Sequence, residues 1–173
     1  EYNLLDGYPS PENPRIVGEN LRQINHRIIA SKRGKEFFDG DRNFGYGGYK
    51  YDGRWKPLAS KLCNEYLNQN SNFLQINCEK GFLLNDIKTN RKDINIYGTE
   101  TSNYAIENSM SSVKKYISKQ LPYDLTFNDN YFEFVIALGV VYTQTLDNAI
   151  KVLKEIVRVS KGKSFITLAT YET

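Results

Sequence analysis

The chain has 173 residues, of which 40% are hydrophobic, and its 23 basic and 20 acidic side chains give a formal net charge of +3. A length of this order suits one domain with a buried core, and the near balance of charge gives no indication of a nucleic-acid partner. No apolar run approaches the roughly 20 residues of a membrane-spanning helix, and neither Cys63 nor Cys78 belongs to a Cys-x-x-Cys pair. A soluble cytoplasmic protein with neither disulfide framework nor metal site is expected.

The first 56 residues predict a region separate from the rest. Residues 1–13 contain proline without periodicity and are expected to form an arm. Apolar residues then recur at helical spacing, which predicts an amphipathic helix over residues 14–31. The recurring residues are Val17, Leu21, Ile24 and Ile28. The following segment, Asp39 to Trp55, is too rich in glycine for a regular helix. Linkers are seldom this aromatic, so a ligand-covering loop or an ordered aromatic cover is expected.

From Pro57 onward, helical and strand patterns alternate. Helices are expected near 58–67, 82–87, 104–108 and 146–157, and strands near 73–77, 94–97, 113–117, 132–138 and 164–169. Thr145 is an expected N-cap, and Gly162 an expected helix stop. This order predicts an α/β fold with a doubly wound, mostly parallel sheet over residues 57–173.

The strand near 73–77 leads through a turn ending in Gly81 into the next helix. A strand that delivers its carboxyl end to a glycine turn and a helix N-terminus forms the crevice in which open α/β sheets bind nucleotide cofactors. The sequence therefore predicts a cofactor loop here, in which glycine is unusually scarce.

Several strings resemble the class I S-adenosylmethionine-dependent methyltransferases, over nearly the whole chain after the N-terminal arm. The family's first motif is a strand followed by Leu-Asp-x-Gly-x-Gly-x-Gly. The equivalent string here is Leu74-Gln75-Ile76-Asn77-Cys78-Glu79-Lys80-Gly81. Gln75 stands in place of the acid, and Asn77 and Glu79 in place of two glycines. The segment from Leu121 to Ile136 is similar to the family's string before its fourth strand, and Glu155 to Lys163 resembles a structural helix segment.

The resemblance implies a Rossmann-like fold and S-adenosylmethionine as cofactor. It gives Glu100, at the end of the second strand, the role of binding the ribose hydroxyls, and the alternative is that Glu100 caps the helix starting near Ser102. Gly45 to Trp55 resembles a cover segment of some family members that act on sugars and small molecules, with an arginine that could meet the methionine carboxylate. Packing of an ordered cover is the alternative for that segment.

The cofactor loop, the end of the second strand and the cover segment supply the expected cofactor-binding residues. The expected cofactor-binding residues are Glu100, Gly81, Gln75, Asn77, Thr101, Arg54, Tyr49 and Tyr51. Tyr142 and Asp129, near the ends of the fourth strand, are candidates for serving the acceptor, with core and turn roles as alternatives.

Two functions remain open from the sequence. The first is an S-adenosylmethionine-dependent methyltransferase acting on a small molecule such as a sugar or polysaccharide precursor. The second is a degenerate, non-catalytic methyltransferase-like subunit that acts as scaffold or partner of an active enzyme. A nicotinamide oxidoreductase is disfavoured because Gly-x-Gly-x-x-Gly is absent, and a base-modifying methyltransferase because the Asn-Pro-Pro-Tyr type of string is absent. The chain ends after the fifth strand, whereas the family fold has two more. We therefore expect either a fragment, or a dimer or heteromeric partner that completes the sheet.

Overall fold

The computed structural model describes residues 4–9 and 23–168. In chain order the elements are α1 (Ile24–Ser31), α2 (Lys35–Asp39), α3 (Lys56–Lys61), η1 (Leu62–Tyr66), β1 (Asn72–Ile76), α4 (Phe82–Asn90), β2 (Asn95–Glu100), α5 (Asn103–Glu107), η2 (Lys114–Tyr116), β3 (Ile117–Lys119), β4 (Phe134–Ala137), η3 (Val141–Thr143), α6 (Leu146–Val159) and β5 (Ser164–Ile166).

The five strands form one sheet in the order β3-β2-β1-β4-β5, and every neighbouring pair is parallel. The chain builds outward from β1 in one direction and from β4 in the other. The sheet therefore reverses its winding between β1 and β4, where open α/β sheets leave a crevice beyond the carboxyl ends of the strands. The predicted doubly wound, parallel α/β fold is confirmed.

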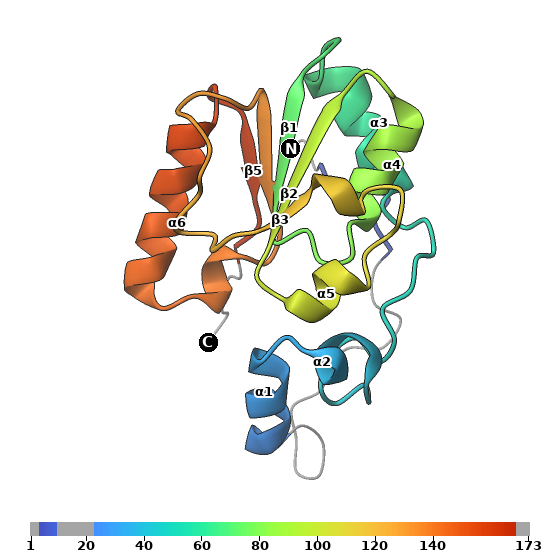
Figure 1. Ribbon diagram of the computed structural model, residues 1–173, viewed down its shortest axis with the longest axis vertical. Helices are drawn as coiled ribbons and strands as arrows, with labels where there is room; N and C mark the ends of the chain where they lie inside the picture. The colour runs from blue at the N-terminus through green and yellow to red at the C-terminus, as the bar shows by residue number, and fades with distance from the viewer. Residues whose placement is uncertain (1–3, 10–22, 169–173) are drawn as a thin grey trace.

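Helices cover both faces of the sheet, with α3 and α4 on one side and α6 on the other (Figure 1). Alternate residues of β1 serve the two layers, because successive side chains of a strand point to opposite faces. Phe73 packs into the cluster of α3 and α4, whereas Leu74 and Ile76 pack with Val152 and Ile156 of α6. Both faces of β1 are thus buried, as its nearly continuous apolar sequence predicts.

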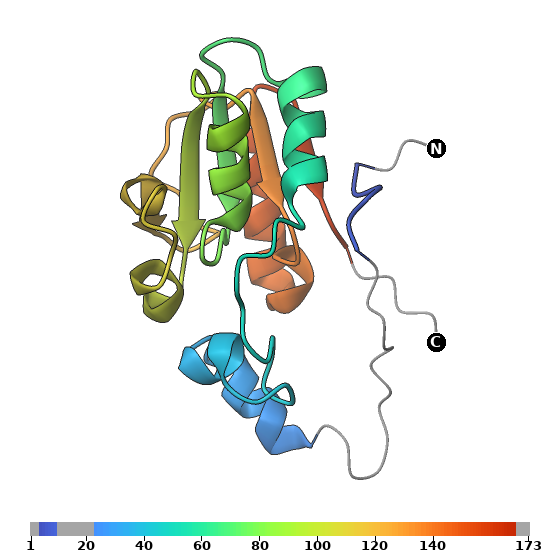
Figure 2. The same cartoon turned by 90° about the vertical axis from the view of Figure 1, so that its right-hand side faces the viewer.

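The N-terminal helices α1 and α2 lie beneath the carboxyl ends of the strands (Figure 2). Phe38 of α2 is fully buried, and it packs with Tyr49 and with Phe82 at the start of α4. Tyr49 and Phe82 stack with their ring centroids 4.7 Å apart. This aromatic cluster fixes the glycine- and tyrosine-rich segment against the core as an ordered cover, which was one of the two expectations for it.

Two predicted elements are wrong in their bounds. The first helix begins at Ile24 with Gln23 as its N-cap, whereas residues 14–22 of the predicted helix lie outside the described part. The two described residues of its expected apolar stripe are exposed, Ile24 at 76% and Ile28 at 53%. The third strand is β3 and not residues 113–117. Val113 is buried because it packs under the turn at Gly81, whose added Cβ would lie 2.8 Å from it.

Candidate functional site

Two adjoining hollows lie at the carboxyl ends of β1 and β4, where the sheet reverses its winding. The first has a volume of about 250 Å³ and the second about 450 Å³. The residues that line both are Tyr46, Asn77, Glu79, Leu138, Gly139 and Tyr142. The hollows therefore join the loop after β1, the segment after β4 and the N-terminal cover in one candidate site.

The loop after β1 keeps the backbone shape of a glycine-rich turn without most of the glycines. Asn77, Glu79 and Gly81 all have positive φ, at 52°, 55° and 76°. These are the three positions at which the methyltransferase motif has glycine. Asparagine tolerates this left-handed conformation, whereas glutamate is strained there by about 1 kcal/mol. The substitutions thus change the side chains of the loop more than its path.

The Glu79 side chain occupies the space between the cover and the end of β2. Its carboxylate accepts a hydrogen bond of 2.6 Å from the Tyr46 hydroxyl and lies 3.5 Å from the Arg33 guanidinium. Burial raises the pKa of the Glu79 carboxyl above its usual range, against the lowering effects of Arg33 and Tyr46. Burial and the Glu79 charge together raise the pKa of Tyr46, which keeps that hydroxyl a hydrogen-bond donor.

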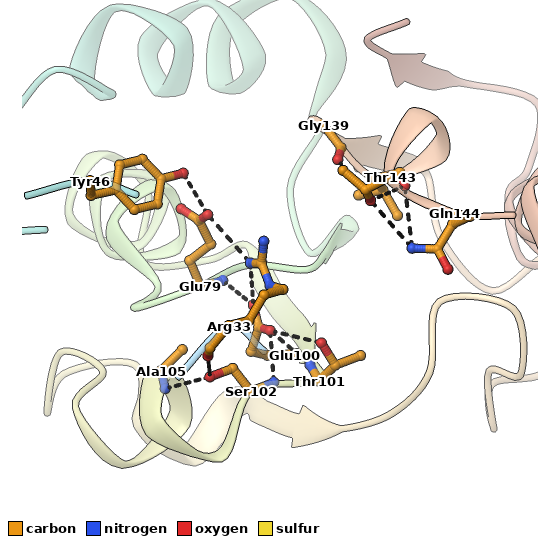
Figure 3. A network of polar contacts seen from close by, with 11 residues as sticks. Arg33, Tyr46, Glu79, Glu100, Thr101, Ser102, Ala105, Gly139, Thr143 and Gln144 are labelled. Atoms are coloured by element: carbon orange, nitrogen blue, oxygen red, sulfur yellow. Dashed lines mark hydrogen bonds and ion pairs between the residues drawn. The ribbon is translucent and has the colours of Figure 1, made fainter. Parts of the chain in front are cut away.

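Glu100 is fully buried at the end of β2, and backbone groups hold its carboxylate. Oε1 accepts hydrogen bonds from the N–H groups of Thr101 and Ser102, at 2.8 and 2.9 Å. Oε2 accepts one from the N–H of Glu79 at 2.7 Å, and Arg33 lies 3.8 Å from it. Figure 3 shows Arg33 between the two glutamates. Glu100 therefore ties the β1 loop to the start of α5, and Arg33 covers it.

The first hollow is rich in hydrogen-bond acceptors and aromatic rings. The side-chain oxygens of Gln75 and Asn77 are buried and accept no hydrogen bond. Gln75 is only 6% exposed, so the lack of a partner is unfavourable for it unless a ligand supplies one. Tyr8 and Trp55 form part of the wall, with ring centroids 4.6 Å apart. Acceptors and aromatic faces together suit a positively charged group.

The structure brings some of the other expected site residues to the hollows and leaves others apart. Tyr142 lines both hollows and is 49% exposed. The Tyr49 ring is buried in the cover and stacks on Tyr46 at 4.2 Å. Gly81 is the N-cap of α4, and the N–H of Thr101 binds Glu100.

Three expected residues make their main contacts outside the hollows. The Tyr51 hydroxyl donates to Asp86 at 2.5 Å, and Arg54 pairs with Asp52 at 2.5 Å. Asp129 precedes β4, at the amino end of the sheet, where it pairs with Arg158 at 2.8 Å. Hydrogen bonds with Asp52 and with Tyr8, which lines the first hollow, raise the pKa of the Arg54 guanidinium. The roles of these three residues at the site stay predictions.

Sequence reasoning missed Arg33 and Tyr46. Tyr46 belongs to the same glycine- and tyrosine-rich string as Tyr49. The sequence thus indicated the right segment but not the tyrosine that lines the hollows. Arg33 had no sequence signal, because its contacts with Glu79 and Glu100 span 46 and 67 positions of the chain and depend on how α1 and α2 fold back.

Within residues 4–9 and 23–168, no group of three or more His, Cys, Asp or Glu side chains is arranged to hold a metal ion. The same part of the chain contains no helix that is long and apolar enough to cross a membrane. Cys63 and Cys78 are both buried free thiols, and burial raises the pKa of Cys63 to about 11.

Several solved structures share this fold. A Methanococcus maripaludis protein assigned as an S-adenosyl-L-methionine-dependent methyltransferase matches with a TM-score of 0.55 at 18% identity, over 65% of this chain and 54% of its own. The PH0226 protein of Pyrococcus horikoshii OT3 matches with a TM-score of 0.55 at 16% identity, over 76% and 60%. A Haloferax volcanii complex of the methyltransferase activator Trm112 with a protein assigned as a methyltransferase matches with a TM-score of 0.53 at 18% identity, over 65% and 50%.

The chain therefore has the fold of the S-adenosylmethionine-dependent methyltransferases, and it spans only 50% to 60% of the length of these three structures. The profile of the family described as "Methionine biosynthesis protein MetW" matches residues 59–171. The chain belongs to that family. No curated protein sequence matches it.

Proposed function

We propose that the chain binds S-adenosylmethionine and transfers its methyl group to a small molecule. The observation that carries the proposal is the pair of buried, unpartnered acceptors Gln75 Oε1 and Asn77 Oδ1. They belong to two residues that line an aromatic-walled hollow at the point where the sheet reverses. S-adenosylmethionine brings an ammonium group and a sulfonium, both positively charged. The acceptors and rings of the first hollow fit that end of the molecule.

Some residues of the chain would bind the cofactor, and others would align the methyl acceptor. Gln75 and Asn77 would hold the ammonium end, and the Tyr8 and Trp55 rings exclude water from it. Glu100 would meet the ribose hydroxyls once Arg33 moves aside. When bound, S-adenosylmethionine supplies an electrophilic methyl group. The protein then mainly aligns the acceptor, and Tyr142, half-exposed between the two hollows, is suited to contact it.

The acceptor class rests on sequence alone. The string from Gly45 to Trp55 resembles the cover segment of family members that act on sugars and other small molecules, and this favours a sugar or polysaccharide precursor. The free thiols of Cys63 and Cys78 favour a reducing compartment such as the cytoplasm.

A second function, a non-catalytic subunit that supports an active enzyme, has a specific observation in its favour. Glu79 fills space that glycine leaves open, and Arg33 covers Glu100. Both features oppose cofactor binding. The Haloferax complex with the Trm112 activator shows that a protein of this fold can work beside a partner, and a heteromeric partner or a dimer is proposed here too.

Isothermal titration of the folded chain with S-adenosylmethionine and S-adenosylhomocysteine separates the two functions. The matched pair of variants is Gln75→Met, which removes the unpartnered acceptor, and Gln69→Met, at an exposed position outside the hollow. Micromolar binding that Gln75→Met weakens at least tenfold, with Gln69→Met unchanged, would support the enzyme. A folded chain that binds neither compound at millimolar concentration would rule out the standalone enzyme and favour the subunit.

A further inference from the structure

Arg33 differs from the structural cations of the chain in how loosely it is held. Arg158 donates five hydrogen bonds of 2.7 to 2.8 Å, which use all three of its guanidinium nitrogens. Lys80 donates three of 2.7 to 2.9 Å. Arg33, in contrast, reaches its two carboxylates only at 3.5 and 3.8 Å, and its buried Nε has no acceptor. Moving its side chain thus breaks few good bonds.

The backbone of Arg33 is fixed although its side chain is not. Its carbonyl oxygen accepts a hydrogen bond of 2.5 Å from the Ser102 hydroxyl, next to the loop that holds Glu100. Its φ of 46° is in the left-handed region, a conformation that persists only where the surroundings impose it. The guanidinium rests on the rings of Phe37 and Phe38, 5.0 and 5.6 Å from their centroids. The main chain of Arg33 is anchored, whereas its side chain makes few good hydrogen bonds. The side chain is therefore suited to change rotamer while the backbone stays in place.

The position of this side chain decides access to Glu100. Both oxygens of Glu100 already accept backbone hydrogen bonds, and the side of Oε2 that remains faces Arg33. The Glu79 carboxylate draws the guanidinium to this place, and the Tyr46 hydroxyl holds Glu79 in turn. Without Glu79, Arg33 would lose one of the two carboxylates that hold it beside Glu100.

We infer that Arg33 and Glu79 form a gate over Glu100, closed in the described state, which a ribose-bearing ligand must open to reach that carboxylate. The inference rests on the proposed function, and it adds regulation of the same site. For a ligand that binds only the open state, the apparent affinity is the affinity of the open state multiplied by the fraction of molecules that are open. The gate therefore sets the affinity for the ribose end of the cofactor.

The test compares Arg33→Gln and Glu79→Gln with Lys35→Gln, a control that removes one positive charge at an exposed position of α2. S-adenosylhomocysteine and adenosine are titrated into each chain. If the closed state is populated about 90% of the time, its removal raises affinity about tenfold, so we expect both gate variants to bind both compounds about tenfold more tightly than the parent and Lys35→Gln to match the parent. Gln75→Met should lose affinity for S-adenosylhomocysteine but not for adenosine.

A second arm needs no cofactor. The urea midpoints of Arg33→Gln, Glu79→Gln and the double variant form a cycle that measures whether the two side chains act as a pair. We expect the shift of the double variant to differ from the sum of the single shifts. Suppose that the parent chain binds the compounds and that the gate variants bind them no more tightly. That result would overturn the gate and leave the proposed function intact. If no chain binds either compound, the proposed function fails, and additive urea shifts would then overturn the gate as well.

Discussion

Glu79 combines two unfavourable features in one residue. Its φ of 55° places a side chain in a conformation that favours glycine, and its carboxylate is largely buried close to the buried Glu100. The Tyr46 hydroxyl and the Arg33 guanidinium compensate the charge. Burial raises the pKa of the carboxyl, and a hydrogen bond from Tyr49 also acts to lower it. In the proposed gate, this residue holds Arg33 beside Glu100.

Replacing Glu79 by glycine and by alanine separates backbone strain from side-chain chemistry. Both variants lose the carboxylate, but only alanine keeps a Cβ at positive φ. We expect Glu79→Gly to be more stable than Glu79→Ala by about 1 kcal/mol, measured by urea unfolding. At Glu107, an exposed residue of α5, the same pair of substitutions should show the opposite order, because alanine favours helices. Equal stabilities at position 79 would mean that the loop carries no strain.

At the scale of elements, one side chain joins α6 to the long loop before β4. Arg158 donates to the carbonyl oxygens of Leu125 and Phe127, and it also binds Glu155 and Asp129. Glu155 in turn accepts the N–H of Leu125 at 2.8 Å. Hydrogen bonds from Arg158 lower the pKa of Glu155, so the carboxylate stays charged and keeps the clamp formed.

Arg158→Lys keeps the charge of this clamp but removes its planar array of donors. An ammonium group cannot reach two carbonyls and two carboxylates at once, so a loss of about 2 kcal/mol in the free energy of unfolding is expected. Lys154→Arg, on an exposed position of the same helix, is the control and should change stability by less than about 0.5 kcal/mol. A loss for Arg158→Lys no larger than that of the control would contradict the clamp.

The packing of β2 against the cofactor loop and α4 leaves no space for a side chain at Gly98. A Cβ at Gly98 would lie 2.7 Å from both Cys78 Sγ and Leu84 Cδ1. Gly98→Ala should therefore destabilise the chain by about 1 to 3 kcal/mol through overpacking, which thermal and urea unfolding would measure. Gly34→Ala, where a Cβ meets nothing within 4 Å, should cost clearly less. Similar losses at the two positions would show that the loop can move away from β2.

Local sequence patterns predicted the helices and strands whose apolar residues match their burial in the fold. β1 and β4 are apolar runs at the centre of the sheet, and α6 has both an N-cap and a clear stripe, so their types follow from sequence. β3 was misplaced because Val113 is apolar for its packing under Gly81 and not for a strand. The expected site residues Gln75 and Asn77 came from one contiguous motif. Arg33 could not, because its position depends on the fold of the whole cover.

For the whole molecule, the decisive junction is the one between the N-terminal cover and the core. Lys80 of the cofactor loop is 9% exposed, and its ammonium group lies 2.7 Å from the Asp39 carboxylate of α2. Asp39 also accepts hydrogen bonds from the Tyr104 hydroxyl and the Tyr49 N–H, at 2.7 and 3.0 Å. This cluster and the aromatic rings around Phe38 hold the cover in place.

The Asp39 carboxylate makes the stability of this junction dependent on pH. Burial alone would raise the pKa of Asp39, but hydrogen bonds from Lys80, Tyr104 and the Tyr49 backbone outweigh it and lower the pKa below its ordinary value of 3.8. The folded chain therefore binds this proton less tightly than the unfolded chain. The stabilisation is complete above about pH 3.8 and is lost as the pH falls through the lowered pKa.

Asp39→Asn should thus be less stable than the parent by about 2 kcal/mol at neutral pH, because Lys80 loses its charged partner. The difference should shrink as urea unfolding is repeated from about pH 7 down to about pH 2, since the parent then protonates the same carboxylate. Asp124→Asn, at an exposed aspartate, should show little difference throughout. A gap at position 39 that stays constant to the lowest pH would mean that the side chain stabilises the junction by packing and not by charge, and that the cover is held by its aromatic rings alone.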